Sequence, residues 1–186
     1  MEDLVVIRHG QTEWSAAGRH TSRTDLDLTA EGEREARTLA ATLAGRSFVV
    51  VICSPRKRAL RTAELAGLSV TAVDDDLVEW DYGEYEGLTT AEIRKHRPNW
   101  SLWTDGTPGG ESPDQIGERI DRLLRRLATM DGEVALVGHG HALRVVTARW
   151  LGLPVRDGAL FQLDSATLSV LGHEHGLPVI ERWNVH

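Results

Sequence analysis

The chain has little of several residue types and patterns that define whole classes of protein. Cys53 is the single cysteine among 186 residues, so no internal disulfide can form. No stretch approaches the ~20 apolar residues that a membrane-spanning helix needs. The start, Met1-Glu2-Asp3, is acidic and its apolar run is too short for a signal peptide. These absences predict a cytoplasmic protein that does not associate with a membrane.

Positive charge is also scarce. There are 21 Lys and Arg against 28 Asp and Glu, which gives a net charge of −7 with neutral histidine. Such a balance argues against nucleic acid or an anionic membrane as the main partner. No internal repeat, low-complexity tract or linker divides the chain. We therefore expect a single domain over residues 1–186.

What the chain does contain is three short apolar runs that each lead directly into a group of polar or cationic residues. The runs are residues 4–7 before Arg8-His9-Gly10, residues 49–52 before Cys53-Ser54, and residues 134–137 before Gly138-His139-Gly140. Short β-branched runs of this kind are typical of strands that are buried on both faces and hence parallel. Ligands of open α/β sheets bind outside the carboxyl ends of such strands. The sequence thus gathers histidines and arginines at one sheet edge, which favours a small, strongly anionic ligand.

Helix patterns alternate with the strands. Ser54-Pro55 looks like an N-cap followed by proline at the first helical position, and Thr89 with Glu92 looks like a capping box. Strands that alternate with helices indicate an α/β layered sheet. Helices are predicted over residues 30–44, 55–66, from Thr89, from Ser112 and over 142–151, and late strands over 167–171 and 179–183.

His9 is the candidate nucleophile. A histidine just past a buried strand is held rigidly, and if one ring nitrogen donates to a backbone carbonyl, the other is free to attack. Arg8 and Arg58 each present a planar fork that suits phosphate oxygens, and His139 would be a further donor to the same oxyanion. Together these groups would stabilise the charge on a transferring phosphoryl group.

The leaving oxygen of a phosphorylated substrate also needs a proton, and Glu79 is the candidate donor. It stands between an apolar strand end and Trp80, surroundings that favour a general-acid role. Asp81 and Glu84 are nearby alternatives, and periodicity alone does not choose among the three.

Four segments in this order resemble the motifs of the histidine phosphatase superfamily, which contains the cofactor-dependent phosphoglycerate mutases. They are Arg8-His9-Gly10-Gln11-Thr12-Glu13-Trp14, Ser54-Pro55-Arg56-Lys57-Arg58-Ala59, Glu79-Trp80-Asp81-Tyr82-Gly83 and Gly138-His139-Gly140-His141-Ala142-Leu143-Arg144. The resemblance implies a three-layer α/β/α sandwich with a mostly parallel sheet, and no metal or other cofactor. It makes His9 the phosphorylated nucleophile and Glu79 the proton donor, with a phosphate pocket formed by Arg8, Arg58 and His139. The substrate-binding residues then expected are Arg8, Ser15, Thr21, Ser22, Arg58, Gly140 and His141.

Within the superfamily the chain is most similar to the small broad-range phosphatases and the sedoheptulose-bisphosphatase branch. The mutases are longer between the acid motif and the last histidine. They also tend to carry asparagine where Ser15 stands and a threonine-glycine pair near Thr21-Ser22. These departures favour a phosphatase over a mutase.

Other phosphatase chemistries fit the sequence less well. A cysteine phosphatase would want five residues between cysteine and arginine, whereas four separate Cys53 from Arg58. Asp74-Asp75-Asp76 mimics the aspartate pair of haloacid-dehalogenase-type phosphatases, but neither Lys57 nor Lys95 is convincingly placed to assist it, and a turn is the simpler interpretation. At His139-Gly140-His141, anion binding is favoured over metal binding because the nearby arginines would repel a cation.

The sequence therefore predicts a metal-independent phosphatase that acts on small phosphomonoesters, such as sugar phosphates, through a phosphohistidine. A mutase is the alternative, and a silent phospho-ligand binder is a third. A homodimer is compatible with the sequence, but the sequence does not show which residues would form the dimer interface. A second anionic group of the substrate would meet one or more of Arg19, His20, Arg23, Lys95, His141 and Arg144.

Overall fold

A mixed sheet organises the chain, and the computed structural model describes residues 2–186. Its six strands lie in the order β3-β2-β4-β1-β5-β6. β1 to β4 pair in parallel, whereas β5 runs antiparallel to β1 and β6 antiparallel to β5. The strands are β1 (Leu4–Arg8), β2 (Phe48–Cys53), β3 (Ala72–Val73), β4 (Glu133–Gly138), β5 (Leu168–Glu174) and β6 (Leu177–Val185).

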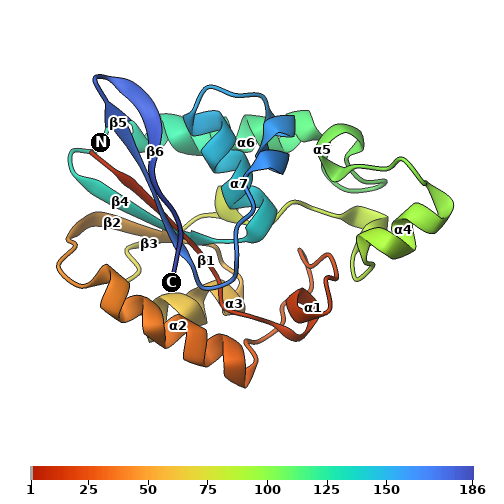
Figure 1. Cartoon of the computed structure of the whole chain (residues 1–186), viewed down its shortest axis with the longest axis horizontal. Coiled ribbons are helices and arrows are strands. Elements are labelled where there is room, and N and C mark those ends of the chain that lie inside the picture. The colour runs from red at the N-terminus through yellow and green to blue at the C-terminus, as the bar shows by residue number, and fades with distance from the viewer. Residues whose placement is uncertain (1) are drawn as a thin grey trace.

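Helices cover both faces of this sheet. Figure 1 shows α2 and α3 on one face and α6 and α7 on the other, while α1, α4 and α5 lie to one side of the sheet. The three-layer α/β/α sandwich with a mostly parallel sheet is thus confirmed. The helices are α1 (Glu13–Ala16), α2 (Ala30–Leu43), α3 (Lys57–Leu65), α4 (Thr90–His96), α5 (Leu102–Asp105), α6 (Pro113–Leu127) and α7 (Gly140–Trp150).

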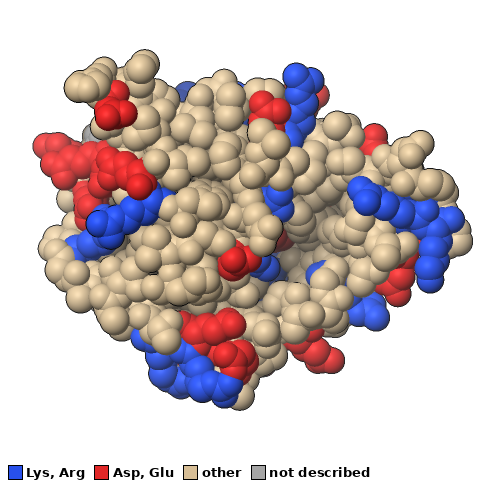
Figure 2. Space-filling view, in the orientation of Figure 1, with Lys and Arg blue, Asp and Glu red and all other residues tan. Residues whose placement is uncertain are grey.

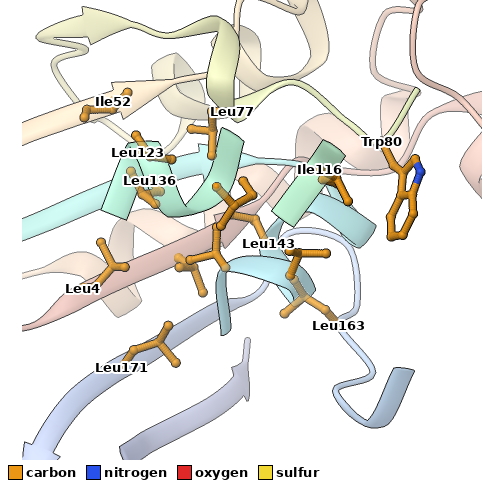
Figure 3. Packing of buried hydrophobic residues seen from close by; sticks show 14 of the residues in the cluster. Leu4, Ile52, Leu77, Trp80, Ile116, Leu123, Leu136, Leu143, Leu163 and Leu171 are labelled. Carbon is orange, nitrogen blue, oxygen red and sulfur yellow. The ribbon is translucent and has the colours of Figure 1, made fainter. Parts of the chain in front are cut away.

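The central strand β1 is buried on both faces, as its unbroken apolar run predicts. Leu4 and Val6 belong to the cluster under α6 and α7, and Val5 and Ile7 belong to the cluster under α2 and α3. The alternation follows from the two-residue period of a strand. Figure 3 shows the first cluster, in which Leu4, Leu136 and Leu171 come from strands, Ile116 and Leu123 from α6, and Leu143 from α7.

The start of α3 differs from the prediction. Ser54-Pro55 does not begin the helix, because α3 starts at Lys57 with Arg56 as an N-cap that makes no side-chain bond. The carboxylate of Asp25 instead accepts the Lys57 N–H at 2.9 Å. The hydroxyl of Ser54 is consequently directed elsewhere, into the candidate site described below.

The other elements follow the predictions with small shifts. The capping boxes at Thr89 and Ser112 are both present. α7 begins at Gly140, two residues before its predicted start, and the late strands form a β5–β6 hairpin. Among residues 2–186, no helix has both the length and the apolar character that crossing a bilayer requires.

Candidate active site

The carboxyl ends of three neighbouring strands bring the candidate residues together. His9 follows β1, Ser54 follows β2 and His139 follows β4. Main-chain bonds fix these strand ends to one another: His9 N donates to Gly138 O at 3.0 Å and Ser54 N donates to Val137 O at 2.9 Å. The imidazole centroids of His9 and His139 are 5.2 Å apart, edge to face.

The ring of His9 is held in one tautomer. Its Nδ1 lies 2.7 Å from the carbonyl oxygen of Gly10, which can only accept, so Nδ1 carries the proton and Nε2 keeps its lone pair. Burial lowers the pKa of His9 well below its usual value, and the cations Arg58 and Arg8 lower that pKa further. A neutral, oriented imidazole with one unprotonated nitrogen is the form that acts as a nucleophile.

His9 faces a cavity of about 200 Å³. Figure 2 shows a hollow on this face of the molecule with Lys or Arg atoms inside it. The lining is predominantly polar, with three arginines and one carboxylate. It comprises Arg8, His9, Thr12, Ser15, Gly18, Arg19, His20, Thr21, Glu79, Tyr82, Thr90, Gly140, His141, Arg144 and Leu163.

Arg8 brings a buried guanidinium to the cavity. Its Nη1 donates to Leu163 O, but its buried Nε has no hydrogen-bond partner among the described residues. The guanidinium lies over Gly140, where a Cβ would be 3.4 Å from Arg8 Cζ. Burial lowers the pKa of Arg8, although the neighbouring carboxylate of Glu79 acts in the opposite direction. A buried donor without an acceptor is costly, so this N–H is available for an anionic ligand.

Arg58 and His139 lie behind the cavity and do not line it. Arg58 is fully buried, and its Nε donates to His139 Nδ1 at 3.2 Å. Since Nδ1 accepts, His139 Nε2 carries the proton and donates to Ser54 Oγ at 2.7 Å. Both ring nitrogens are therefore occupied, so in this structure His139 is not the free phosphate donor that the sequence predicts. Burial first, and then the Arg58 cation, lower the pKa of His139 well below its usual value.

Glu79 reaches the cavity from the segment after β3 and also caps α7. Its Oε1 accepts from Ala142 N and Trp80 N, both at 2.8 Å, and its Oε2 accepts from His141 N at 3.1 Å. These three main-chain donors give the carboxylate a polar setting, which differs from the apolar surroundings that the sequence indicates. The early start of α7 follows from this cap.

The structure also distinguishes Glu79 from the two alternative proton donors, Asp81 and Glu84. The Asp81 carboxylate binds Arg23 and Gly83 N, and Glu84 is exposed on the surface. Within residues 2–186, Glu79 is the only carboxylate in the cavity lining.

Of the predicted substrate-binding residues, Ser15, Thr21, Gly140 and His141 line the cavity together with Arg8. Ser22 does not. It is 3% exposed, and both its N–H and its hydroxyl donate to the carboxylate of Glu86. Ser22 instead lies inside the protein, where its buried polar groups need the Glu86 carboxylate as a partner.

Among the additional cationic candidates, Arg19, His20 and Arg144 line the cavity, whereas Arg23 and Lys95 do not. Tyr82, whose hydroxyl lies 2.6 Å from His141 Nδ1, was not predicted to line the cavity, although it stands inside the acid motif. The lining residues Thr12, Thr90 and Leu163 were not predicted either, because no local pattern gives a signal for them.

A comparison with known families bears on this arrangement. The profile described as "Histidine phosphatase superfamily (branch 1)" matches residues 4–186. The chain belongs to the histidine phosphatase superfamily.

Known relatives of this superfamily member agree with that assignment. An acid phosphatase of Mycobacterium tuberculosis is 45% identical over 94% of this chain and 88% of the relative. Sedoheptulose 1,7-bisphosphatase of Saccharomyces cerevisiae is 37% identical over 82% of this chain and 68% of the relative. The solved structure of a Mycobacterium tuberculosis open reading frame product gives a TM-score of 0.94 at 43% identity, covering 99% of this chain and 97% of that one. The histidine phosphatase is thus a phosphoric monoester hydrolase.

The structure also bears on the two alternative phosphatase chemistries, those of Cys53 and of Asp74-Asp75-Asp76. Burial raises the pKa of Cys53 to about 12, which leaves the thiol protonated and unreactive. Asp74 and Asp76 form ion pairs with Arg122 and Arg126 on α6, consistent with a structural turn.

Tryptophans support the site without lining it. None of the six tryptophans, all within residues 2–186, is among the cavity-lining residues. The Trp103 ring carries the Arg144 guanidinium 4.6 Å from its centroid and meets the His141 ring at 5.3 Å. Trp103 thus supports two cavity-lining residues, Arg144 and His141, from behind.

Proposed function

We propose that the chain is a phosphatase that hydrolyses small phosphomonoesters through a phosphohistidine at His9, without a metal. The observation that carries this proposal is the tautomer of His9. Its Nδ1 donates to the Gly10 carbonyl, so the lone pair of Nε2 is free to attack a substrate in the cavity that His9 lines.

Two further features support the proposal. The cavity is small, about 200 Å³, which suits a small ester better than a phosphoprotein. Its cations outnumber its one carboxylate, as binding of a phosphate dianion requires. Relatives named acid phosphatase and sedoheptulose 1,7-bisphosphatase favour a sugar phosphate or similar metabolite as substrate.

In the first step His9 Nε2 attacks phosphorus in line with the ester oxygen. The N–P bond forms as the P–O bond to the leaving group breaks. Protonated Glu79 gives its proton to the departing alkoxide, which leaves as an alcohol. The unpaired Nε–H of Arg8 binds a phosphoryl oxygen, and the buried Arg58 adds positive charge from behind His9. His139 orients Arg58 through the bond to its Nε.

In the second step water attacks phosphorus and the N–P bond breaks. Glu79, now ionised, accepts the proton from that water. The three main-chain N–H groups bound to its carboxylate hold Glu79 at the cavity through both steps. Phosphate then leaves, and His9 regains its lone pair.

The test is His9→Ala assayed against a panel of phosphomonoesters. We expect turnover to fall by a factor of about 10⁴ or more, because the covalent route is lost. Brief incubation of the parent with a ³²P-labelled ester should give an acid-labile adduct that His9→Ala lacks. Turnover of the variant near the parent rate, or an adduct on another residue, would remove the proposal.

Two controls sharpen this test. Adding a chelator should leave the parent rate unchanged, and a chelator-dependent loss would contradict the metal-free step. Incubation with 3-phosphoglycerate and a trace of bisphosphate should release phosphate faster than it isomerises the substrate. The opposite order would identify a mutase.

A further inference from the structure

The guanidinium of Arg58 is oriented by a short polar segment. Its Nη1 donates to Thr24 O at 3.0 Å, and its Nη2 donates to Thr21 O at 3.1 Å and Ser22 O at 3.4 Å. We call residues 21–24 the Arg58 cradle. Together with the bond from Nε to His139, the cradle fixes the plane of the guanidinium beside His9.

The cradle is in turn held by one carboxylate. Glu86 Oε1 accepts from Ser22 N and Thr24 N, both at 3.0 Å. Glu86 Oε2 accepts from Ser22 N at 3.0 Å and from Ser22 Oγ at 2.6 Å. Bonds to an ionised acceptor are the stronger kind. Because these donors come from the residues whose carbonyls bind Arg58, the carboxylate sets the direction of those carbonyls.

We propose that Glu86 is a positioning residue for phosphoryl transfer: it acts through the cradle on Arg58 and touches neither substrate nor His9. The proposal rests on the proposed function, in which Arg58 stabilises the phosphoryl group. Glu86 is absent from the cavity lining, which separates its role from substrate contact. It also explains why Ser22 lies inside the protein: Ser22 ties Glu86 to Arg58.

The same cradle connects to the cavity wall. Thr21, its first residue, lines the cavity. Main-chain bonds join the preceding residue to the segment after Glu86, with His20 N donating to Leu88 O at 2.9 Å and Gly87 N donating to His20 O at 2.8 Å. Loss of the Glu86 carboxylate therefore displaces Arg58 more than it displaces the cavity wall, because the wall keeps these main-chain bonds.

The experiment compares Glu86→Gln with Glu84→Gln. A glutamine turns an NH₂ group toward donors that need an acceptor, so the cradle loosens. Glu84 lies two residues away, is exposed and makes no side-chain hydrogen bond within residues 2–186, so its substitution is the charge-matched control. Displacing a catalytic group by about 1 Å costs about 10²-fold. We therefore expect kcat/KM to fall about 10- to 100-fold for Glu86→Gln and less than about 2-fold for Glu84→Gln.

A double-mutant cycle decides between positioning and general destabilisation. In an Arg58→Ala background, Glu86→Gln should cost less than about 2-fold, since its route of action is already gone. An equal loss in both backgrounds, or a Glu86→Gln enzyme at the parent rate, would overturn the proposal. If Glu86→Gln does not fold, Ser22→Ala removes one bond to Glu86 and enters the same cycle, with a smaller but equally Arg58-dependent loss expected.

Calorimetric binding of inorganic phosphate gives a readout that needs no turnover. Glu86→Gln should weaken phosphate binding in the parent background and leave it unchanged in Arg58→Ala. A parent that binds phosphate but hydrolyses no ester would remove the proposed function while leaving this cycle informative. If Glu86→Gln binds phosphate as tightly as the parent and the parent hydrolyses esters, the positioning role of Glu86 is contradicted and the proposed function is not.

Discussion

Arg8 shows how a single buried side chain can be committed to a ligand. Leu163 O accepts from Nη1 and fixes the guanidinium, while Nε lacks a partner in the described part of the chain. An ammonium group cannot reproduce this division, because a lysine has one terminal nitrogen and no planar fork. The identity of the cation should therefore matter as much as its charge.

We predict that Arg8→Lys lowers kcat/KM about 10²- to 10³-fold, the usual cost of losing one preorganised donor. Steady-state kinetics on a phosphomonoester measure it. Arg37→Lys is the matched control, since the exposed Arg37 pairs with Glu33 and lies outside the cavity lining, and it should change kcat/KM less than about 2-fold. Equal rates for Arg8→Lys and the parent would show that Arg8 supplies only charge.

At this scale the sequence predicts residues whose place follows from a strand end. His9 reaches the cavity as expected because it directly follows β1, whereas Glu79 lies beyond the end of β3 at Val73 and was predicted from its motif and neighbours. Ser22 and His139 were placed less well. Their hydrogen bonds go to Glu86, Arg58 and Ser54, which lie 64 to 85 positions away, and no local pattern encodes such partners.

Among the elements, the contact between the loop after β1 and the first turn of α2 governs the position of His9, the proposed nucleophile. A Cβ at Gly32 would lie 2.1 Å from Gln11 O, and one at Gly10 would lie 2.4 Å from Gly32 O. The two backbones touch directly, so helix α2 supports the loop that holds His9 through its Gly10 carbonyl. Neither position can accept a side chain without movement of the backbone.

Gly32→Ala tests this contact. Alanine normally stabilises a helix by about 1 kcal/mol relative to glycine, but overpacking costs about 1–3 kcal/mol. We expect the free energy of unfolding in urea to fall by about 1–2 kcal/mol and kcat to fall at least about 10-fold. The exposed Thr38→Ala in the same helix should leave kcat unchanged. A more stable and fully active Gly32→Ala protein would contradict the close approach.

Element boundaries were predictable where the cap is local and not where it is remote. Thr89 and Ser112 begin α4 and α6 through residues three positions ahead, as their spacing indicates. The starts of α3 and α7 depend on Asp25 and Glu79, which come from distant segments. The predicted start of α3 was wrong for that reason.

For the whole molecule, the buried histidines tie stability to pH. Burial lowers the pKa of His9, His139 and His141 well below the usual value, and nearby arginines add to the effect. In the unfolded chain these imidazoles take up protons near pH 6.5, whereas in the folded protein they stay neutral to lower pH. The unfolded state therefore binds more protons below about pH 6.5.

We predict that the free energy of unfolding is constant above about pH 7 and falls as the pH decreases from about 6.5 to 5. Each histidine contributes a slope of up to about 1.4 kcal/mol per pH unit. Urea denaturation at several pH values in this range measures the slope. Most carboxylates titrate at lower pH and therefore contribute little to it. His141→Asn should flatten it and the exposed His96→Gln should not. Stability that stays level or rises toward pH 5 would refute the assignment.

Two kinds of structure form the cavity, a strand end on its inner side and a loop on its outer side. His9 follows directly on a central strand of the sheet, whereas the outer wall around Gly18–Thr21 is a loop that main-chain bonds join to the segment before α4. Main-chain bonds do not depend on which side chains the loops carry. Natural selection can therefore exchange the residues of this wall, and with them the preferred ester, while inheriting the phosphorus chemistry unaltered.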